Sequence, residues 1–171
     1  MKNRPRLSPW SFVLAALIIS IVSLSLFSAV QAASRSVPFK AQITAHELVV
    51  DNSPSCPAQH SSTILGTGVG THVGRFTINM RDCFTLLPFP PFEFQNGAFT
   101  LTAADGSELH GTYEGDLLAT DKFPILQLQG TYQIIGGTKR FQNATGSGAL
   151  SGTDNIFTGE VAVSLDGTIN F

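Results

Sequence analysis

Three residues whose side chains end in a polar group lie at the apolar positions of an alternating pattern, and they are the first candidates for chemistry. His72, Tyr113 and Tyr132 each share a two-residue alternation with apolar neighbours. This spacing predicts that they point to the inner face of a strand. Because a few polar groups in an apolar cavity orient a bound small molecule, all three are candidate ligand-binding residues. The alternative is that each hydrogen-bonds inside a filled core.

A fourth candidate, Arg140, lies beside Lys139 in a glycine-rich turn. Its guanidinium group could reach a carboxylate ligand, or it could lie on a surface hairpin. Glu108, His110 and Glu114 also have a regular spacing, but they share the polar face of their strand. A solvated surface is the simpler interpretation of that face, so the sequence identifies no catalytic residue.

The two cysteines of the chain, Cys56 and Cys83, indicate a disulfide bond. Both lie in the part of the chain that we expect to be exported, where thiols are normally oxidised. A metal-ligating or reactive pair would need further ligands, and His60 is the only histidine close to either cysteine in the sequence. The four histidines form no His-x-His pair. We therefore expect neither a metal site nor a cofactor.

The elements that must position these residues are predicted to be strands. From Val37 onward, apolar and polar residues alternate with period two, and turn residues interrupt the pattern about every ten positions. Asp105-Gly106 predicts a hairpin, and Asp166-Gly167 predicts a last turn before residues 168–171. Sixteen glycines, many of them inside strands, indicate the bends of a small closed barrel. The predicted fold is all-β, a single eight-stranded antiparallel β-barrel, with a β-sandwich as the alternative.

The segment 87–94 departs from this pattern, because it holds three prolines and three phenylalanines. Proline cannot donate to a sheet ladder, so the segment predicts an extended loop. Its phenylalanines, Phe89, Phe92 and Phe94, need apolar surroundings. The loop could be a plug over one barrel end, a lid over a ligand mouth, or a contact site for a partner.

The first thirty-two residues have the pattern of a secretory signal peptide. Lys2, Arg4 and Arg6 precede an apolar stretch, which ends at the small-residue sequence Val30-Gln31-Ala32. We therefore expect two parts, a signal peptide (1–32) and a barrel domain (33–171), and a secreted or periplasmic location. The alternative is an uncleaved membrane anchor.

Cleavage after residue 32 would leave a domain with seven basic and twelve acidic residues, a net charge of −5. A mildly acidic domain without a basic cluster does not favour nucleic acid as a partner. It would also keep no stable membrane span.

One further motif resembles a known family. Residues 136–146, GGTKRFQNATG, are similar to the GGTGRF-x-x-A-x-G signature of the allene oxide cyclase barrel-like superfamily, which includes plant dirigent proteins. Residues 70–74 (GTHVG) and 101–109 (LTAADGSEL) are similar to the GTHLG and LTAANGDEL segments of its exported bacterial members. The closing residues 167–171 (GTINF) also fit, so the resemblance covers most of the barrel domain in the expected order.

This resemblance implies an eight-stranded antiparallel barrel whose lumen holds an apolar small molecule, as in allene oxide cyclases, dirigent proteins and some spiro-cyclases. It also implies oligomerisation, often as a trimer. The chain departs from the signature at Lys139, where the family usually has glycine. No catalytic carboxylate or arginine of the characterised enzymes maps onto a matching position, so activity does not follow from the fold.

Three functions are therefore open. The protein could bind a lipophilic small molecule in the lumen or at the mouth of the barrel. It could be a cofactor-free cyclase or isomerase that acts through shape and a few polar groups. It could also be a ligand-free structural or interaction protein. We favour binding, because catalysis would normally require an ionisable residue on the inner face, and only His72 meets that condition.

Overall fold

The computed structural model describes residues 35–51, 53–54, 56–57, 60–85 and 87–171. The predicted signal peptide, residues 1–32, lies outside the described residues. Among the described residues, no helix is long and apolar enough to cross a membrane.

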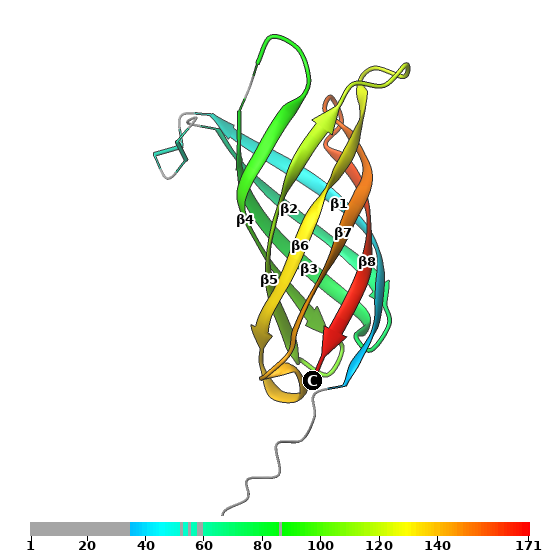
Figure 1. Cartoon of the computed structure of the whole chain (residues 1–171). Coiled ribbons are helices and arrows are strands. Elements are labelled where there is room, and N and C mark those ends of the chain that lie inside the picture. Colours follow the sequence, from blue (N-terminus) through cyan, green and yellow to red (C-terminus); the bar gives the residue numbers. More distant parts are fainter. Residues whose placement is uncertain (1–34, 52, 55, 58–59, 86) are drawn as a thin grey trace, which may run out of the picture. The chain divides into compact units, whose positions relative to one another are not determined.

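The described residues form a closed barrel in which each strand pairs with the next and the last pairs with the first (Figure 1). Every pairing is antiparallel. The predicted eight-stranded antiparallel barrel is thus confirmed. The strands are β1 (Ser36–Asp51), β2 (His60–Gly70), β3 (Gly74–Phe84), β4 (Phe92–Ala103), β5 (Glu108–Leu118), β6 (Ile125–Gly137), β7 (Thr145–Asn155) and β8 (Glu160–Asn170).

Period-two alternation decides which side chains fill the barrel. In β1, Phe39, Ala41, Ile43 and Ala45 are buried and the residues between them are exposed. The other strands also contribute alternate buried residues to one apolar core. Burial of this inner face is the main force that closes the sheet, since each strand has only one apolar side.

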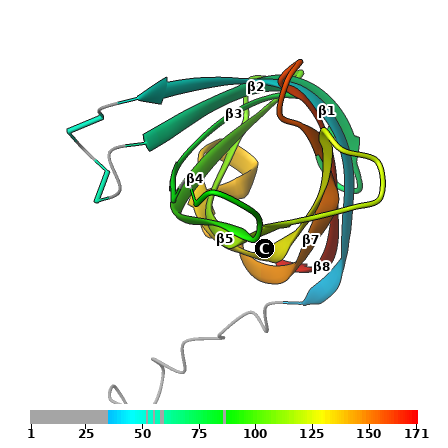
Figure 2. The same cartoon turned by 90° about the horizontal axis from the view of Figure 1, so that it is seen from above.

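The two ends of the barrel differ. The short turns between β2 and β3 and between β4 and β5 lie at the lower end of Figure 1, as does the 3-10 turn η1 (Lys139–Phe141). Seen from above, η1 lies within the outline of the barrel (Figure 2). Phe141, at the end of η1, is 1 % exposed. We call this the closed end; the opposite end, which carries the other four connections, is the open end.

The predicted turn at Asp166-Gly167 is wrong, because both residues lie inside β8. Gly167 pairs with Gly148 of β7. A Cβ atom on either glycine would lie 2.7 Å from the hydroxyl oxygen of Tyr132. The two glycines therefore make room for a large side chain from β6 and do not turn the chain.

Segment 87–94 is only partly a loop. β4 begins at Phe92, so Phe92 and Phe94 are strand residues. Phe94 is buried, Phe92 is half-buried, and Phe89 is 80 % exposed. The prolines end before the strand begins, which removes their conflict with the sheet ladder.

Candidate functional site

The open half of the barrel contains a cavity of about 390 Å³. This volume is within the range of about 300–1,000 Å³ that is usual for small-molecule sites. All eight strands contribute to its wall, which is mostly aliphatic and aromatic. Ile64, Met80, Phe94, Leu128 and Val163 are among its apolar residues.

Three carboxyl groups face into this apolar cavity: Glu47 from β1, Asp82 from β3 and Asp154 from β7. Each continues the inward alternation of its strand. Glu47 follows Ala45, and Asp82 follows Met80. Asp82 is 7 % exposed and Asp154 is 3 % exposed. Buried carboxyl groups without a basic partner are costly, so this cluster marks the cavity as a candidate site.

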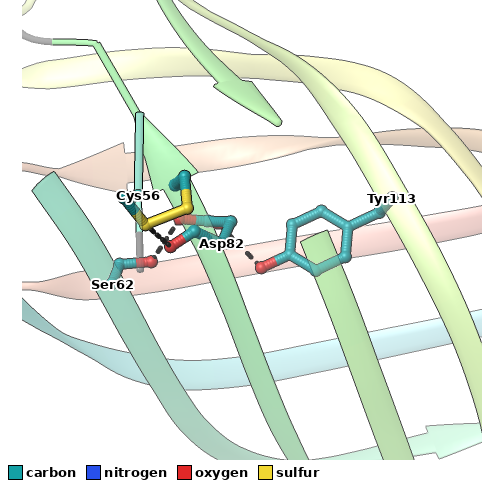
Figure 3. Close-up of a disulfide and its surroundings, with 5 residues drawn as sticks. Cys56, Ser62, Asp82 and Tyr113 are labelled. Atoms are coloured by element: carbon teal, nitrogen blue, oxygen red, sulfur yellow. Dashed lines mark hydrogen bonds between the residues drawn. A yellow bond between two sulfur atoms is a disulfide. The ribbon is translucent and has the colours of Figure 1, made fainter. Parts of the chain in front are cut away.

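Asp82 is held by two hydroxyl groups (Figure 3). Ser62 donates to Oδ1 at 2.6 Å, and Tyr113 donates to Oδ2 at 2.7 Å. Ser62 pairs with Asp82 across the β2–β3 ladder, whereas Tyr113 reaches it from β5. Both carboxylate oxygens therefore have a donor inside the barrel.

An irregularity in β4 shapes the wall beside Asp82. The register shifts between Phe94 and Gly97 against β5, and between Gln95 and Ala98 against β3. Asn96, which lies in both intervals, has φ of 56°. An extra residue of this kind reverses the alternation. As a result Phe94 points inward, and its ring lies 5.9 Å from that of Tyr113.

Burial shifts the pKa values of this cluster. It raises the pKa of the Asp82 carboxyl, against the opposing effect of the hydrogen bonds from Ser62 and Tyr113. It also raises the pKa of Tyr113 well above the usual value, with the Asp82 charge adding to the effect. Tyr113 therefore keeps its proton and remains a donor to Asp82.

Glu47 and Asp154 act as a pair. Burial, followed by the charges of Asp154 and Asp82, raises the pKa of Glu47 to about 8. Burial also raises the pKa of Asp154, while its hydrogen-bonding interaction with Glu47 lowers it. At neutral pH Glu47 is therefore mainly protonated and Asp154 is the partner that more readily carries charge. Asp154 Oδ1 is buried and has no hydrogen-bond partner among the described residues.

The predicted disulfide between Cys56 and Cys83 is confirmed, with the Cα atoms 5.4 Å apart. It attaches the β1–β2 connection to the end of β3. Cys56 Sγ lies 3.9 Å from the backbone carbonyl oxygen of Asp82 (Figure 3). The disulfide thus fixes the backbone that carries one of the cavity carboxyl groups.

The four predicted ligand-binding residues do not lie together. Tyr113 lines the cavity. Tyr132 is 1 % exposed and packs in the closed half, where its ring lies 6.2 Å from that of Phe39. Its hydroxyl group has no hydrogen-bond partner among the described residues. His72 and Arg140 lie at the closed end, away from the cavity.

The inward orientation predicted for His72 is wrong. It lies in the turn before β3, has φ of 63°, and is exposed. The alternation of Phe76 and Ile78 cannot be extended back to it, because β3 begins only at Gly74. The inward position at this end is taken by Val73, which is 4 % exposed.

Arg140 joins three turns of the closed end. It donates to the backbone carbonyl oxygens of His72 at 3.0 Å and Val73 at 3.3 Å. Its Nε lies 3.1 Å from Asp105 Oδ2, and its guanidinium group lies 4.5 Å from the centre of the Phe141 ring. Neighbouring Lys139 has φ of 50°, in the region that favours glycine, which gives a physical reason for the glycine of the resembling signature.

The sequence pattern did not lead us to predict the three cavity carboxyl groups, Glu47, Asp82 and Asp154, as site residues. The alternation of apolar residues nevertheless indicates two of them. Continuing the alternation Phe76, Ile78, Met80 reaches Asp82. Continuing Ala41, Ile43, Ala45 reaches Glu47 in the same way. Asp154 is harder to find, because glycines replace most apolar residues in β7.

Comparisons with known proteins give only distant similarities. No protein-family model matches the chain, and a comparison with curated proteins finds no match. The resemblance to the allene oxide cyclase superfamily therefore stays a prediction.

The solved structures that are similar to this chain include the following two. One is a nonspecific heme-binding cyclase that catalyses (4 + 2) cycloaddition during neoabyssomicin biosynthesis, with 16 % identity, a TM-score of 0.45, and coverage of 99 % of this chain and 82 % of that chain. The other is the Diels Alderase AbmU from Streptomyces koyangensis, with 17 % identity, a TM-score of 0.41, and coverage of 98 % and 83 %. Because these scores are low, the chemistry of the cavity rests on the chain's own residues.

Proposed function

We propose that this protein is an exported barrel that binds one lipophilic small molecule in the cavity at its open end. The observation that carries the proposal is the cavity itself, about 390 Å³ within the lumen. A filled eight-stranded core would leave no such space, since barrels of this size are just wide enough for their own side chains.

The composition of the wall supports a lipophilic ligand. Aliphatic and aromatic side chains supply contact area, and Asp82, Tyr113 and the Glu47–Asp154 pair supply a few fixed polar groups. Ligand sites commonly combine an apolar wall with a few such groups, which orient the bound molecule. The disulfide supports an extracytoplasmic location, because such bonds persist mainly in oxidising compartments.

Filling the cavity provides a direct test. Leu117 lines the cavity and is half-buried, so a tryptophan there would occupy the space without entering the packed core. Its neighbour Leu118 is also half-buried but does not line the cavity. Leu118→Trp is therefore a matched control on the same strand.

The probe is adamantanol, a rigid apolar molecule, and binding is measured by calorimetry. We expect the wild type and Leu118→Trp to bind it, and Leu117→Trp to bind at least tenfold more weakly. Equal binding by the two variants would place the ligand elsewhere. If neither the wild type nor Leu118→Trp bound any adamantane probe, the binding function would be contradicted.

A second candidate function, a cofactor-free cyclase or isomerase, is favoured by one specific observation. A protonated Glu47, with its pKa raised to about 8, stands in an apolar cavity near Asp82 and could serve as a general acid. The test begins with native mass spectrometry and organic extraction of any molecule that co-purifies with the protein. Catalysis predicts that the wild type converts this molecule, whereas Glu47→Gln binds it without conversion.

A further inference from the structure

The ionisable side chains that line the cavity are all acids. Its wall contains four acidic residues, Glu47, Asp51, Asp82 and Asp154, and none of its described residues is basic. Asp51 lies at the rim and has a partner, since its Oδ1 lies 3.0 Å from Nδ1 of His60. The other three carboxyl groups have no cationic partner within the barrel among the described residues.

Hydrogen bonds satisfy only part of this cluster. Asp82 receives donors on both oxygens. Asp154 is 3 % exposed, lines the cavity, and has a buried Oδ1 atom without a partner among the described residues. An unsatisfied buried carboxylate oxygen is destabilising, so its presence in a cavity calls for a donor from a ligand.

Asp154 and its partner Glu47 reach the cavity from strands that are separated only by β8. Val161 of β8 pairs with Ala45 on one side and with Asp154 on the other. Glu47 follows two residues after Ala45, and its amide donates to the backbone carbonyl oxygen of Gly159 at 2.8 Å. The β-barrel therefore presents Glu47 and Asp154 side by side on the wall.

From this arrangement we propose that the ligand is a lipophilic amine, whose ammonium group binds between Glu47 and Asp154 while its apolar body fills the cavity. This inference rests on the proposed binding function and names the chemical class of the ligand. An ammonium group carries three hydrogen-bond donors and no acceptor, which matches a cluster of carboxylate oxygens. It also supplies the positive charge that the cavity lacks.

The aromatic part of the wall agrees with a cation. Phe94 and Tyr113 line the cavity next to Asp82, and Phe84 and Phe92 lie toward its mouth. Faces of aromatic rings attract ammonium groups when water is excluded. A ligand with a carboxylate, in contrast, would add a like charge to the cluster and be rejected.

The proposal has a protonation signature. Glu47 is mainly protonated in the free protein, because its pKa is raised to about 8. An ammonium group would favour its ionised form, so binding near neutral pH would release a proton. The titratable groups facing this position are Asp82 on β3, Tyr113 on β5 and Asp154 on β7, with Asp51 and His60 at the rim.

Three probes with the same apolar body test the charge preference. Aminoadamantane, adamantanol and adamantane carboxylate differ mainly in the group that would meet the carboxyl cluster. We expect calorimetry to show that aminoadamantane binds at least tenfold more tightly than adamantanol, and that adamantane carboxylate binds most weakly. Calorimetry in two buffers of different ionisation enthalpy should show proton release on binding of the amine only.

The double variant Glu47→Gln with Asp154→Asn removes the charge and keeps the shape. We expect it to lose the preference for the amine while binding adamantanol as the wild type does. Glu114→Gln with Asp116→Asn makes the same two chemical changes on β5 at positions that do not line the cavity. This control should keep the full preference.

The outcomes separate this inference from the proposed function. If adamantanol or the carboxylate bound as tightly as the amine, the cavity would be a binding site but the amine class would be wrong. If the double variant kept the preference, the ammonium group would not lie between Glu47 and Asp154. If no probe bound, both the inference and the proposed function would fail.

Discussion

The two ends of the barrel are built from the same alternating strands, but their side chains are used differently. At the closed end, Phe141 fills the lumen and Arg140 joins three turns through its hydrogen bonds, so this charged side chain stabilises the fold. At the open end, Glu47 and Asp154 are placed in an apolar cavity at a cost to the fold. Carboxyl groups that are costly to bury and only partly satisfied within the chain indicate a role toward a ligand.

The largest expected effect concerns the packing at the closed end. Phe141→Ala should lower the free energy of unfolding by about 3–5 kcal/mol, because a fully buried ring leaves a hole that the structure cannot refill. Phe92→Ala at the open end should cost about 1 kcal/mol, since Phe92 is half-buried beside an existing cavity. Urea unfolding followed by circular dichroism measures both; similar losses would contradict the distinction between the two ends.

The disulfide should have the next largest effect. Replacing both Cys56 and Cys83 by alanine should lower the free energy of unfolding by about 2–4 kcal/mol, since the bond restricts the unfolded chain. It should also weaken binding of adamantanol, because the backbone of Asp82 loses its attachment to the β1–β2 connection. Chemical reduction of the wild type should reproduce the loss of stability and leave the variant unchanged. Unchanged binding would show that the disulfide does not position the cavity.

The pH dependence of stability tests the carboxyl cluster. Glu47 has its pKa raised from 4.5 to about 8, so the folded protein holds this proton more tightly than the unfolded chain. The stability that this proton contributes is present below about pH 4.5 and is lost as the pH rises through about 8. Asp154 and Asp82 have pKa values raised in the same direction.

Glu47→Gln should remove the part of this pH dependence of stability that is due to Glu47. At about pH 9 the variant should be more stable than the wild type by about 2–4 kcal/mol, and at about pH 5 the two should be nearly equal. Thermal unfolding across this range measures the difference, with Glu114→Gln as a control that should follow the wild type. A wild-type curve that does not fall with rising pH would mean that Glu47 is solvated.

The smallest expected effect is that of Arg140. Arg140→Ala should lower the free energy of unfolding by about 1 kcal/mol. Most of this loss comes from the hydrogen bonds to His72 and Val73, because the ion pair with Asp105 is exposed and contributes little. Binding of adamantanol should not change, since Arg140 lies away from the cavity. Calorimetry on this variant tests whether Arg140 only joins the turns of the closed end or also binds the ligand, as predicted from the sequence. A tenfold loss of affinity would support the ligand-binding role.

The fold could be predicted from the sequence because a closed barrel depends on period-two alternation, which is local. The same alternation places Asp82 and Glu47 inside, so part of the site was within reach. The alternation failed at His72, because a turn precedes the strand there. The Asp-Gly turn signal failed at Gly167, because this glycine makes room for Tyr132. The inward position of Phe94 depends on the irregularity at Asn96, and the pairing of Glu47 with Asp154 depends on strands that are distant in sequence. These features are set by tertiary contacts.

The most direct test of a ligand site in the open half is an NMR titration of the isotope-labelled barrel with adamantanol, which locates binding without a variant. We expect backbone amide signals to shift around Glu47, Asp82 and Asp154, and those around Tyr132 and Phe141 to stay in place. Shifts confined to the closed end, or to the outer surface, would contradict binding in the cavity. So would the absence of any shift at millimolar adamantanol.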